Sequence, residues 1–198
     1  MRVAFVVPRF GAQIVGGAEF GARMLAEHLV AVSGWDVEAF TTCSIDHRTW
    51  EDVLPAGTTE ENGVVVHRLQ SKAGRDAGFE PFSDVVLRHP AEASASDAER
   101  WIDLQGPVSP ALLDAVDEAK PDVVVFYPYL YWPTVHGVAK FLRRSVLHPA
   151  THDEAPIRLP LFRSVFEGVG GLVYQTHGER RLTERFFPKT AGLPQSVV

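Results

Sequence analysis

A glycine-containing loop follows the first apolar segment of the chain, in the stretch GAQIVGGAE at residues 11 to 19. Small residues let a backbone approach a ligand closely, and the free N–H groups at the start of the following helix favour an anion. Gly16 and Gly17 are therefore candidates to lie against a phosphate or a sugar phosphate. The alternative is that they only permit a tight turn and close helix packing. Glu19 falls in the first helical turn, where a carboxylate suits the helix dipole, so a structural role and a substrate-binding role both stay open.

This loop departs from two common nucleotide-binding motifs. The spacing from Gly11 to Gly16 fits the opening of a Walker A loop, but Gly17 and Ala18 stand where Lys and Ser/Thr are required. The dinucleotide pattern G-x-G-x-x-G is absent, and the second predicted strand ends without the acidic residue that would hold a ribose. The loop therefore predicts neither an ATPase nor an NAD-binding site.

A second group of reactive side chains is the run His152, Asp153 and Glu154. A neutral imidazole can donate or accept a hydrogen bond, and near its ordinary pKa it can move a proton. His152 is therefore a candidate catalytic residue, with capping of its own loop as the alternative. Asp153 and Glu154 could bind substrate hydroxyl groups or be ordinary surface carboxylates. Adjacent residues rarely aim at one ion, so we expect no metal here.

Aromatic residues gather in the stretch FYPYLYW, residues 126 to 132. Tyr127 and Tyr129 could stack on sugar rings while their hydroxyl groups form hydrogen bonds. Alternatively, they form a wall that packs against a neighbouring domain.

The elements that must position these residues are short apolar runs that alternate with helical periods. Strands are predicted over residues 3–7, 36–41, 64–69, 122–127, 145–150 and 171–176, with an approach to a further strand at 193–198. Helices are predicted from Ala18 to about Ser33 and over residues 97–104, 110–120, 134–144, 159–167 and 178–187. Ser109 and Pro110 should cap and begin the third of these. Residues 71 to 105 give little further signal. The alternation predicts an α/β fold, a doubly wound, mostly parallel sheet with helices on both faces, as one Rossmann-like domain over residues 1–198.

The amino-acid composition argues against several classes of protein. A formal net charge of −6 argues against a general nucleic-acid binder. Cys43 is the single cysteine, so neither an internal disulfide nor a thiolate metal cluster can form. The chain has no apolar run of membrane-spanning length and no signal-peptide pattern at its start, which predicts a cytoplasmic location.

Three stretches together resemble the N-terminal half of a family 4 glycosyltransferase of the GT-B fold. They are the loop ending GGAE before an amphipathic helix, the THDE loop, and the strand and helix unit GLVYQTHGERRLTERF with its T-x-x-E pattern. This resemblance covers essentially the whole chain. It implies a retaining transfer of a sugar from a nucleotide-sugar donor to an acceptor, with no cofactor and no metal.

The resemblance also implies roles for particular residues. Gly16 and Gly17 would lie near the donor diphosphate and the acceptor, and His152 near the transferred sugar. The donor-binding C-terminal domain of such an enzyme would be absent from this chain, which reads as a fragment that is inactive or nearly so alone. Peripheral membrane contact is not indicated by the acidic balance. Two other readings stay open: a stand-alone α/β ligand-binding module without catalysis, and half of a sugar-nucleotide epimerase of similar fold.

Overall fold

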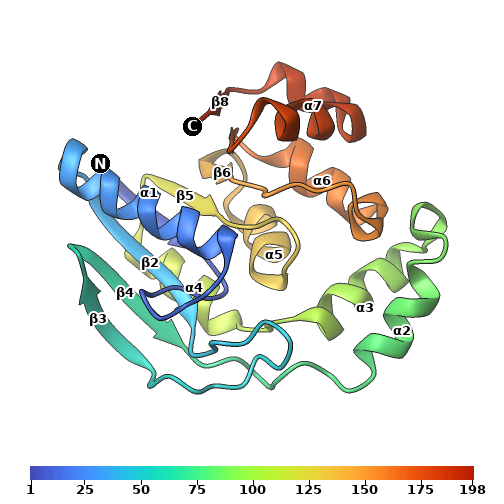
Figure 1. The fold of residues 1–198 in the computed structure, drawn as a ribbon, viewed down its shortest axis with the longest axis horizontal. Helices are drawn as coiled ribbons and strands as arrows, with labels where there is room; N and C mark the ends of the chain where they lie inside the picture. Colours follow the sequence, from blue (N-terminus) through green and yellow to red (C-terminus); the bar gives the residue numbers. More distant parts are fainter.

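A computed structural model describes residues 1–198, and a single eight-stranded sheet runs through it (Figure 1). The strand order is β3-β4-β2-β1-β5-β6-β7-β8, and every neighbouring pair is parallel except the β3–β4 hairpin. The strands are β1 (Arg2–Val6), β2 (Asp36–Thr42), β3 (Gly57–Glu61), β4 (Val64–Leu69), β5 (Val123–Phe126), β6 (Ser145–Leu147), β7 (Gly171–Tyr174) and β8 (Gln195–Val197). The predicted α/β fold with a mostly parallel sheet is confirmed.

Seven α-helices accompany the sheet, and short 3₁₀ turns follow or precede several of them. The helices are α1 (Gly17–Ser33), α2 (Phe79–Val86), α3 (Ala95–Gln105), α4 (Pro110–Ala119), α5 (Trp132–Phe141), α6 (Leu161–Gly168) and α7 (His177–Phe186). The 3₁₀ turns are Pro90–Glu92, Leu142–Arg144, Ala155–Arg158 and Pro188–Gly192.

Side chains of β1 divide the core into two layers, as alternation along a strand requires. Val3 and Phe5 pack with Ala22 and Ala26 of α1 on one face. Ala4 and Val6 point to the other face, where the buried residues include Leu113 of α4, Val138 of α5 and Phe166 of α6. Both faces of the central strands are therefore buried, which is why those strands are continuous apolar runs in the sequence.

The second layer is packed closely because Gly137 lies where α5 crosses β5. A Cβ atom at Gly137 would lie 2.2 Å from Cε1 of Phe126 and 3.1 Å from a methyl carbon of Leu113. The absence of a side chain lets the backbone of α5 approach the ring of Phe126 directly. Helix α5 also contacts the residues that follow β5, because Oγ1 of Thr134 donates to the carbonyl of Pro128 at 2.6 Å.

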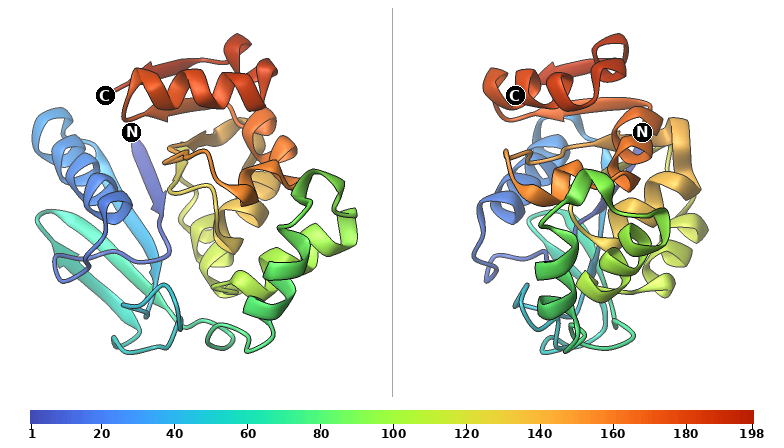
Figure 2. Two further views of the ribbon diagram at one scale, coloured as in Figure 1. Left: turned by 45° about the vertical axis from the view of Figure 1, so that its right-hand side comes forward. Right: turned by 90° about the vertical axis from the view of Figure 1, so that its right-hand side faces the viewer.

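Residues 71 to 105, weakly patterned in the sequence, form the helical pair α2 and α3 beside α5 and α6 (Figure 2). Trp101 and Ile102 of α3 are buried in the larger core, and Nε1 of Trp101 donates to Oγ of Ser83 on α2 at 2.9 Å. The predicted helix at 97–104 is confirmed as part of α3, whereas α2 was not predicted.

Several boundaries differ from the sequence-based expectation. Ser109 precedes α4, but its hydroxyl does not cap that helix; it donates to the carbonyl of Gln70 at 2.9 Å. The predicted strand at 145–150 ends at Leu147, and the predicted helix at 134–144 begins at Trp132 and finishes as a 3₁₀ turn. Strand β3 was not predicted, because its residues are polar and mostly exposed and become a strand only by pairing with β4.

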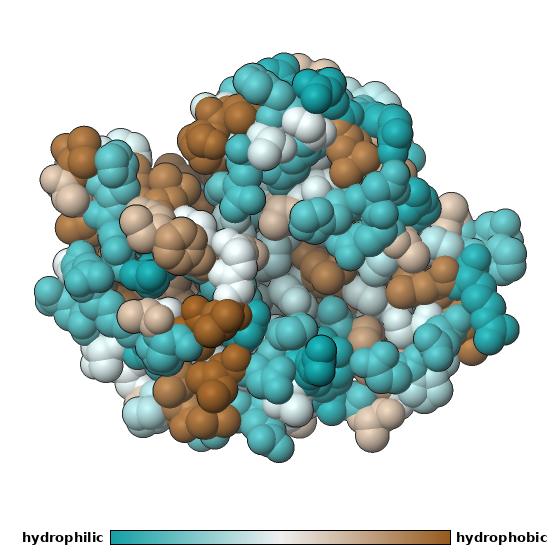
Figure 3. Space-filling view, viewed as in Figure 1, coloured by the Kyte–Doolittle hydropathy of each residue, from teal (hydrophilic) through white to brown (hydrophobic).

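The surface carries no continuous apolar belt on the face drawn in Figure 3, where hydrophobic patches are separated by hydrophilic side chains. The most exposed large apolar residue is Val15, at 91%, in the loop before α1. None of the helices has both the length and the apolar character needed to cross a bilayer.

Candidate functional site

The candidate site lies at the carboxyl edge of the sheet, next to the point where strand order reverses. From β1 the chain goes to β2 on one side, while β5 pairs with β1 on the other side. Loops that follow β1, β5, β6 and β7 leave the sheet at this same edge, which is where ligands bind in open α/β sheets. All residues singled out from the sequence lie on these loops or on the first turn of α1.

The two glycines of the first loop have different surroundings. A Cβ atom at Gly16 would lie 2.1 Å from a carboxylate oxygen of Glu19, so the packing of Glu19 explains this glycine. A Cβ atom at Gly17 would meet nothing within 4 Å. A side chain at position 16 would therefore displace the carboxylate of Glu19, whereas the space beside position 17 is open.

Glu19 is buried and forms an ion pair with Arg9, whose guanidinium also donates to the carbonyl of Ile45 at 3.0 Å. The pairing stabilises both groups, because a buried carboxylate or guanidinium without its partner would be an uncompensated charge away from water. Glu19 thus has a structural partner, Arg9, that is ten residues away and could not be predicted from the sequence. Its contact with a substrate stays a prediction.

Tyr127 and Tyr129 are buried, with 0% and 1% of their surface exposed. Nε2 of Gln175 donates to the hydroxyl oxygen of Tyr127, and the hydroxyl of Tyr129 donates to Oε1 of Glu154 at 2.8 Å. Burial raises the pKa of both phenols, so they stay protonated. Both rings are buried in the core of this chain, so neither presents a free face on which a sugar could stack. Their contact with a substrate, or with a neighbouring domain, stays a prediction.

Helix α1 contacts Tyr127 and Gln175 through Gly21, for which the sequence predicted no role. A Cβ atom at Gly21 would lie 3.0 Å from the hydroxyl oxygen of Tyr127 and 2.9 Å from Nε2 of Gln175. Gly17 and Gly21 are four residues apart and so share one helix face. The open side of Gly17 therefore lies on the face of α1 that meets the loops after β5 and β7.

Neither carboxylate of the His152 loop is free. Asp153 pairs with Arg158 and with Arg185, and these guanidinium groups hold the pKa of its carboxyl group below the ordinary value. Glu154 accepts the hydrogen bond from Tyr129 described above. Both residues therefore stabilise the loop, in keeping with the structural alternative, and their contact with substrate hydroxyl groups stays a prediction.

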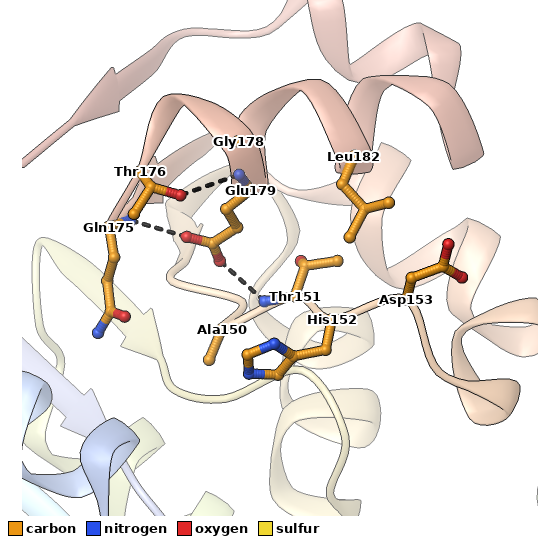
Figure 4. A pocket seen from close by; sticks show the side chains of 9 residues that line it. All are labelled: Ala150, Thr151, His152, Asp153, Gln175, Thr176, Gly178, Glu179 and Leu182. Carbon is orange, nitrogen blue, oxygen red and sulfur yellow. Dashed lines mark hydrogen bonds between the residues drawn. The ribbon is translucent and has the colours of Figure 1, made fainter.

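His152 differs from its two neighbours because its side chain makes no hydrogen bond or ion pair within the chain. The residue is exposed, and Figure 4 shows its ring beside the pocket while the carboxylate of Asp153 is turned away. The imidazole does not cap its own loop, since only the backbone carbonyl of His152 accepts a bond there, from the N–H of Glu154 at 3.0 Å.

The pocket beside His152 has a volume of about 350 Å³ and is formed by two loops and the first turns of α7 (Figure 4). It lies between the loop after β6 and the loop after β7. Its lining residues are Ala150, Thr151, His152, Asp153, Gln175, Thr176, Gly178, Glu179 and Leu182.

One buried carboxylate joins the two loops of the pocket. Oε1 of Glu179 accepts from the backbone N–H of Thr151, and Oε2 accepts from the backbone N–H of Gln175, both at 2.8 Å. Thr176 caps α7 by accepting from the N–H of Glu179 at 3.0 Å, and Thr183 donates to the hydroxyl of Thr151 at 3.1 Å. Glu179 thus fixes the spacing between the His152 loop and the start of α7.

The T-x-x-E pattern, noted above only as part of the family resemblance, has the spacing of a capping box but does not form one. In a capping box the glutamate bonds the N-cap N–H, which would be that of Thr176. Here the carboxylate bonds the preceding residue and a second loop instead. That second loop is 28 residues away in sequence, so spacing alone gave no signal for the link.

His148 lies under this site, after β6, with 2% of its surface exposed. Its ring packs on Tyr127 with centroids 4.2 Å apart, and its Nδ1 has no hydrogen-bond partner. Burial disfavours the charged form and lowers the pKa of His148 to about 4. The imidazole is therefore neutral at physiological pH.

Comparison with known proteins does not identify the family of this chain. No protein-family model matches the chain, and no curated protein matches it. A solved structure of trehalose-6-phosphate from E. coli bound with UDP-2-fluoro glucose is similar, with 16% sequence identity and a TM-score of 0.49. The match covers 97% of this chain and 43% of that one, so this chain spans less than half of that protein. A likeness at this level identifies neither a family nor an activity.

Replacing Glu179 by glutamine should destabilise the protein. The amide places an NH₂ group against one of two buried backbone N–H groups, which leaves a donor without an acceptor, and we expect a loss of about 2 kcal/mol or more in the free energy of unfolding. Urea denaturation measures it. Glu118→Gln, at an exposed position of α4, is the matched control and should change stability by less than about 0.5 kcal/mol. Equal stability of the two variants would show that the hydrogen bonds of Glu179 to Thr151 and Gln175 do not stabilise the fold.

His148 should make the fold sensitive to acid. An unfolded chain binds a proton at this histidine below a pKa of about 6.5, whereas the folded chain resists it down to about 4, so stability falls as pH falls through this window. Between pH 7.5 and pH 5, the expected contribution of this residue is a loss of about 2 kcal/mol. In His148→Phe, which keeps a ring against Tyr127, the pH dependence measured by urea unfolding should shrink by that amount. An unchanged dependence would contradict the assignment.

Proposed function

We propose that this chain is the N-terminal, acceptor-side domain of a retaining glycosyltransferase of the GT-B fold, which transfers a sugar from a nucleotide-sugar donor. The observation that carries the proposal is the unpartnered ring of His152 beside an open pocket at the carboxyl edge of the sheet. Asp153 and Glu154 are engaged within the chain, so His152 is the side chain of this loop that is available to a substrate. The order of the GGAE, THDE and T-x-x-E stretches supports the family 4 assignment.

The geometry supports a division of roles within the site. Glu179 holds the His152 loop in place, so the imidazole needs no partner of its own for positioning. A neutral imidazole can accept from, or donate to, a hydroxyl group of the transferred sugar. Gly17 leaves the first turn of α1 bare, and the N–H groups of that turn are suited to the donor diphosphate.

The proposal requires a second domain. The pocket is formed by two loops and one helix end. These residues would cover only one side of a bound nucleotide sugar. We propose that a C-terminal domain supplies the other side and binds the nucleotide, that the reaction uses no metal, and that the protein works in the cytoplasm. Stabilisation of the departing diphosphate would then come mainly from fixed hydrogen-bond donors of that domain. The isolated chain should show almost no transfer.

The test is a panel of nucleotide sugars and acceptors assayed with the product of the complete reading frame. We expect a donor-dependent glycoside with retained configuration. His152→Ala should lower kcat at least about tenfold, because it removes a group that assists the transition state. His28→Ala, at an exposed position of α1, should leave kcat unchanged.

Three outcomes would contradict the proposal: a reading frame that ends at Val198, an epimerised donor in place of a glycoside, or full activity of His152→Ala. The first favours a stand-alone binding module, the second an epimerase, and the third removes His152 from the reaction.

Gly17→Ala separates packing from ligand contact. No atom of the chain lies within 4 Å of the added methyl group, and alanine favours a helix over glycine, so stability should be unchanged or higher by at most about 1 kcal/mol. If the diphosphate lies against this backbone, KM for the donor should rise severalfold. Gly168→Ala, which also meets nothing within 4 Å, is the control. Unchanged kinetics in Gly17→Ala would place the donor elsewhere.

A further inference from the structure

A cluster of metal-ligating side chains lies where α3 meets α5, on elements separate from the pocket of Figure 4. Glu99 and Asp103 are four residues apart on α3 and so share one helix face. His136 faces them from the second turn of α5. One ligand atom of each residue lies within 4.8 Å of those of the other two.

His136 has a nitrogen atom without a hydrogen-bond partner. Its Nε2 is shielded from solvent, lies 3.5 Å from Oε1 of Glu99 and makes no hydrogen bond. The ring is held in place by Trp132, with centroids 4.3 Å apart. A shielded ring nitrogen of fixed orientation costs free energy when unpaired, and it is a preferred ligand of zinc.

Asp103 is oriented by a hydrogen bond that leaves one of its oxygens free. Nε1 of Trp132 donates to its Oδ1 at 3.1 Å, the kind of supporting contact that positions a metal ligand. No lysine or arginine pairs with Glu99 or Asp103, whose side-chain partners are His136 and Trp132 respectively. Arg100, the cation next to Glu99 in sequence, lies instead over the ring of Phe82. These two carboxylates thus lack a permanent counter-charge, since the only basic group beside Glu99 is the imidazole of His136.

We propose that Glu99, Asp103 and His136 bind a divalent transition metal, with Zn²⁺ as the best fit. One nitrogen and two oxygen ligands on a small tetrahedral ion leave a fourth position for water, and imidazole favours zinc, copper or nickel over magnesium and calcium. A tetrahedral zinc ion brings its ligands to about 3.3 Å from one another. Nε2 of His136 and Oε1 of Glu99 are already 3.5 Å apart, and all three ligand atoms lie within 4.8 Å of one another, so binding requires only a small approach of the side chains.

Such an ion would link α3 to α5, because its ligands come from both helices. Helix α3 belongs to the segment of residues 71 to 105, and α5 directly follows the Tyr127–Tyr131 loop. The metal would therefore stabilise the contact between this segment and the sheet domain, and it has no part in the transfer reaction proposed above.

Isothermal titration of EDTA-treated, tag-free protein with ZnCl₂ tests the site, together with competition against a chromogenic chelator. We expect one Zn²⁺ per chain with a Kd in the micromolar range or below, a raised Tm with Zn²⁺, and no response to Mg²⁺ at the same concentration. His136→Gln and Asp103→Asn should each weaken Zn²⁺ binding at least tenfold. The asparagine keeps an acceptor for Trp132, so this variant should fold as the parent does.

His28→Gln removes an exposed histidine of α1 and should bind Zn²⁺ like the parent. Circular dichroism confirms that each variant is folded. The proposal fails if the parent protein takes up no stoichiometric Zn²⁺, or if folded His136→Gln and Asp103→Asn bind it as tightly as the parent does.

Discussion

The arrangement at the carboxyl edge of the sheet depends on the buried carboxylate of Glu179. The backbone N–H groups of Thr151, in the loop after β6, and of Gln175, in the loop after β7, both donate to this carboxylate. Without it, these donors would be buried without an acceptor. One carboxylate satisfies both at once. The ring of His152 can stay unbonded because the backbone next to it is already fixed.

A comparable division holds on the opposite side of the site. Arg9 and Glu19 neutralise each other inside the protein, and their contact occupies the space that a side chain at Gly16 would need. The neighbouring glycine has no such constraint. The two adjacent glycines therefore differ: the space beside Gly16 is filled by the chain itself, and the space beside Gly17 is open.

The sequence predicted the central strands and most helices because those elements bury apolar side chains in regular patterns. DVVVFY could be assigned with ease, since β5 is covered on both faces. Strand β3 could not, because Thr58, Thr59 and Glu60 are polar and pair only at an edge. The candidate site residues follow such apolar runs or lie in the first turn of α1, and the structure places their loops at one edge of the sheet.

What each side chain does there could not be predicted, because the partners are distant in sequence. Tyr129 and Glu154 are 25 residues apart and Thr151 and Glu179 are 28 apart, so no local spacing shows that they meet. The same holds for Asp103 and His136, which lie on helices separated by α4 and β5.

Gly137 has a consequence for how this protein can change. The volume between α5 and β5 is filled by the ring of Phe126, and position 137 contributes none of it. Because interiors are close-packed, these two positions share one fixed volume. A larger residue at 137 is admissible only with a smaller one at 126, so we infer that substitutions at the two positions are coupled. The loop that begins at Tyr127 is then anchored by a pair of residues that must change together.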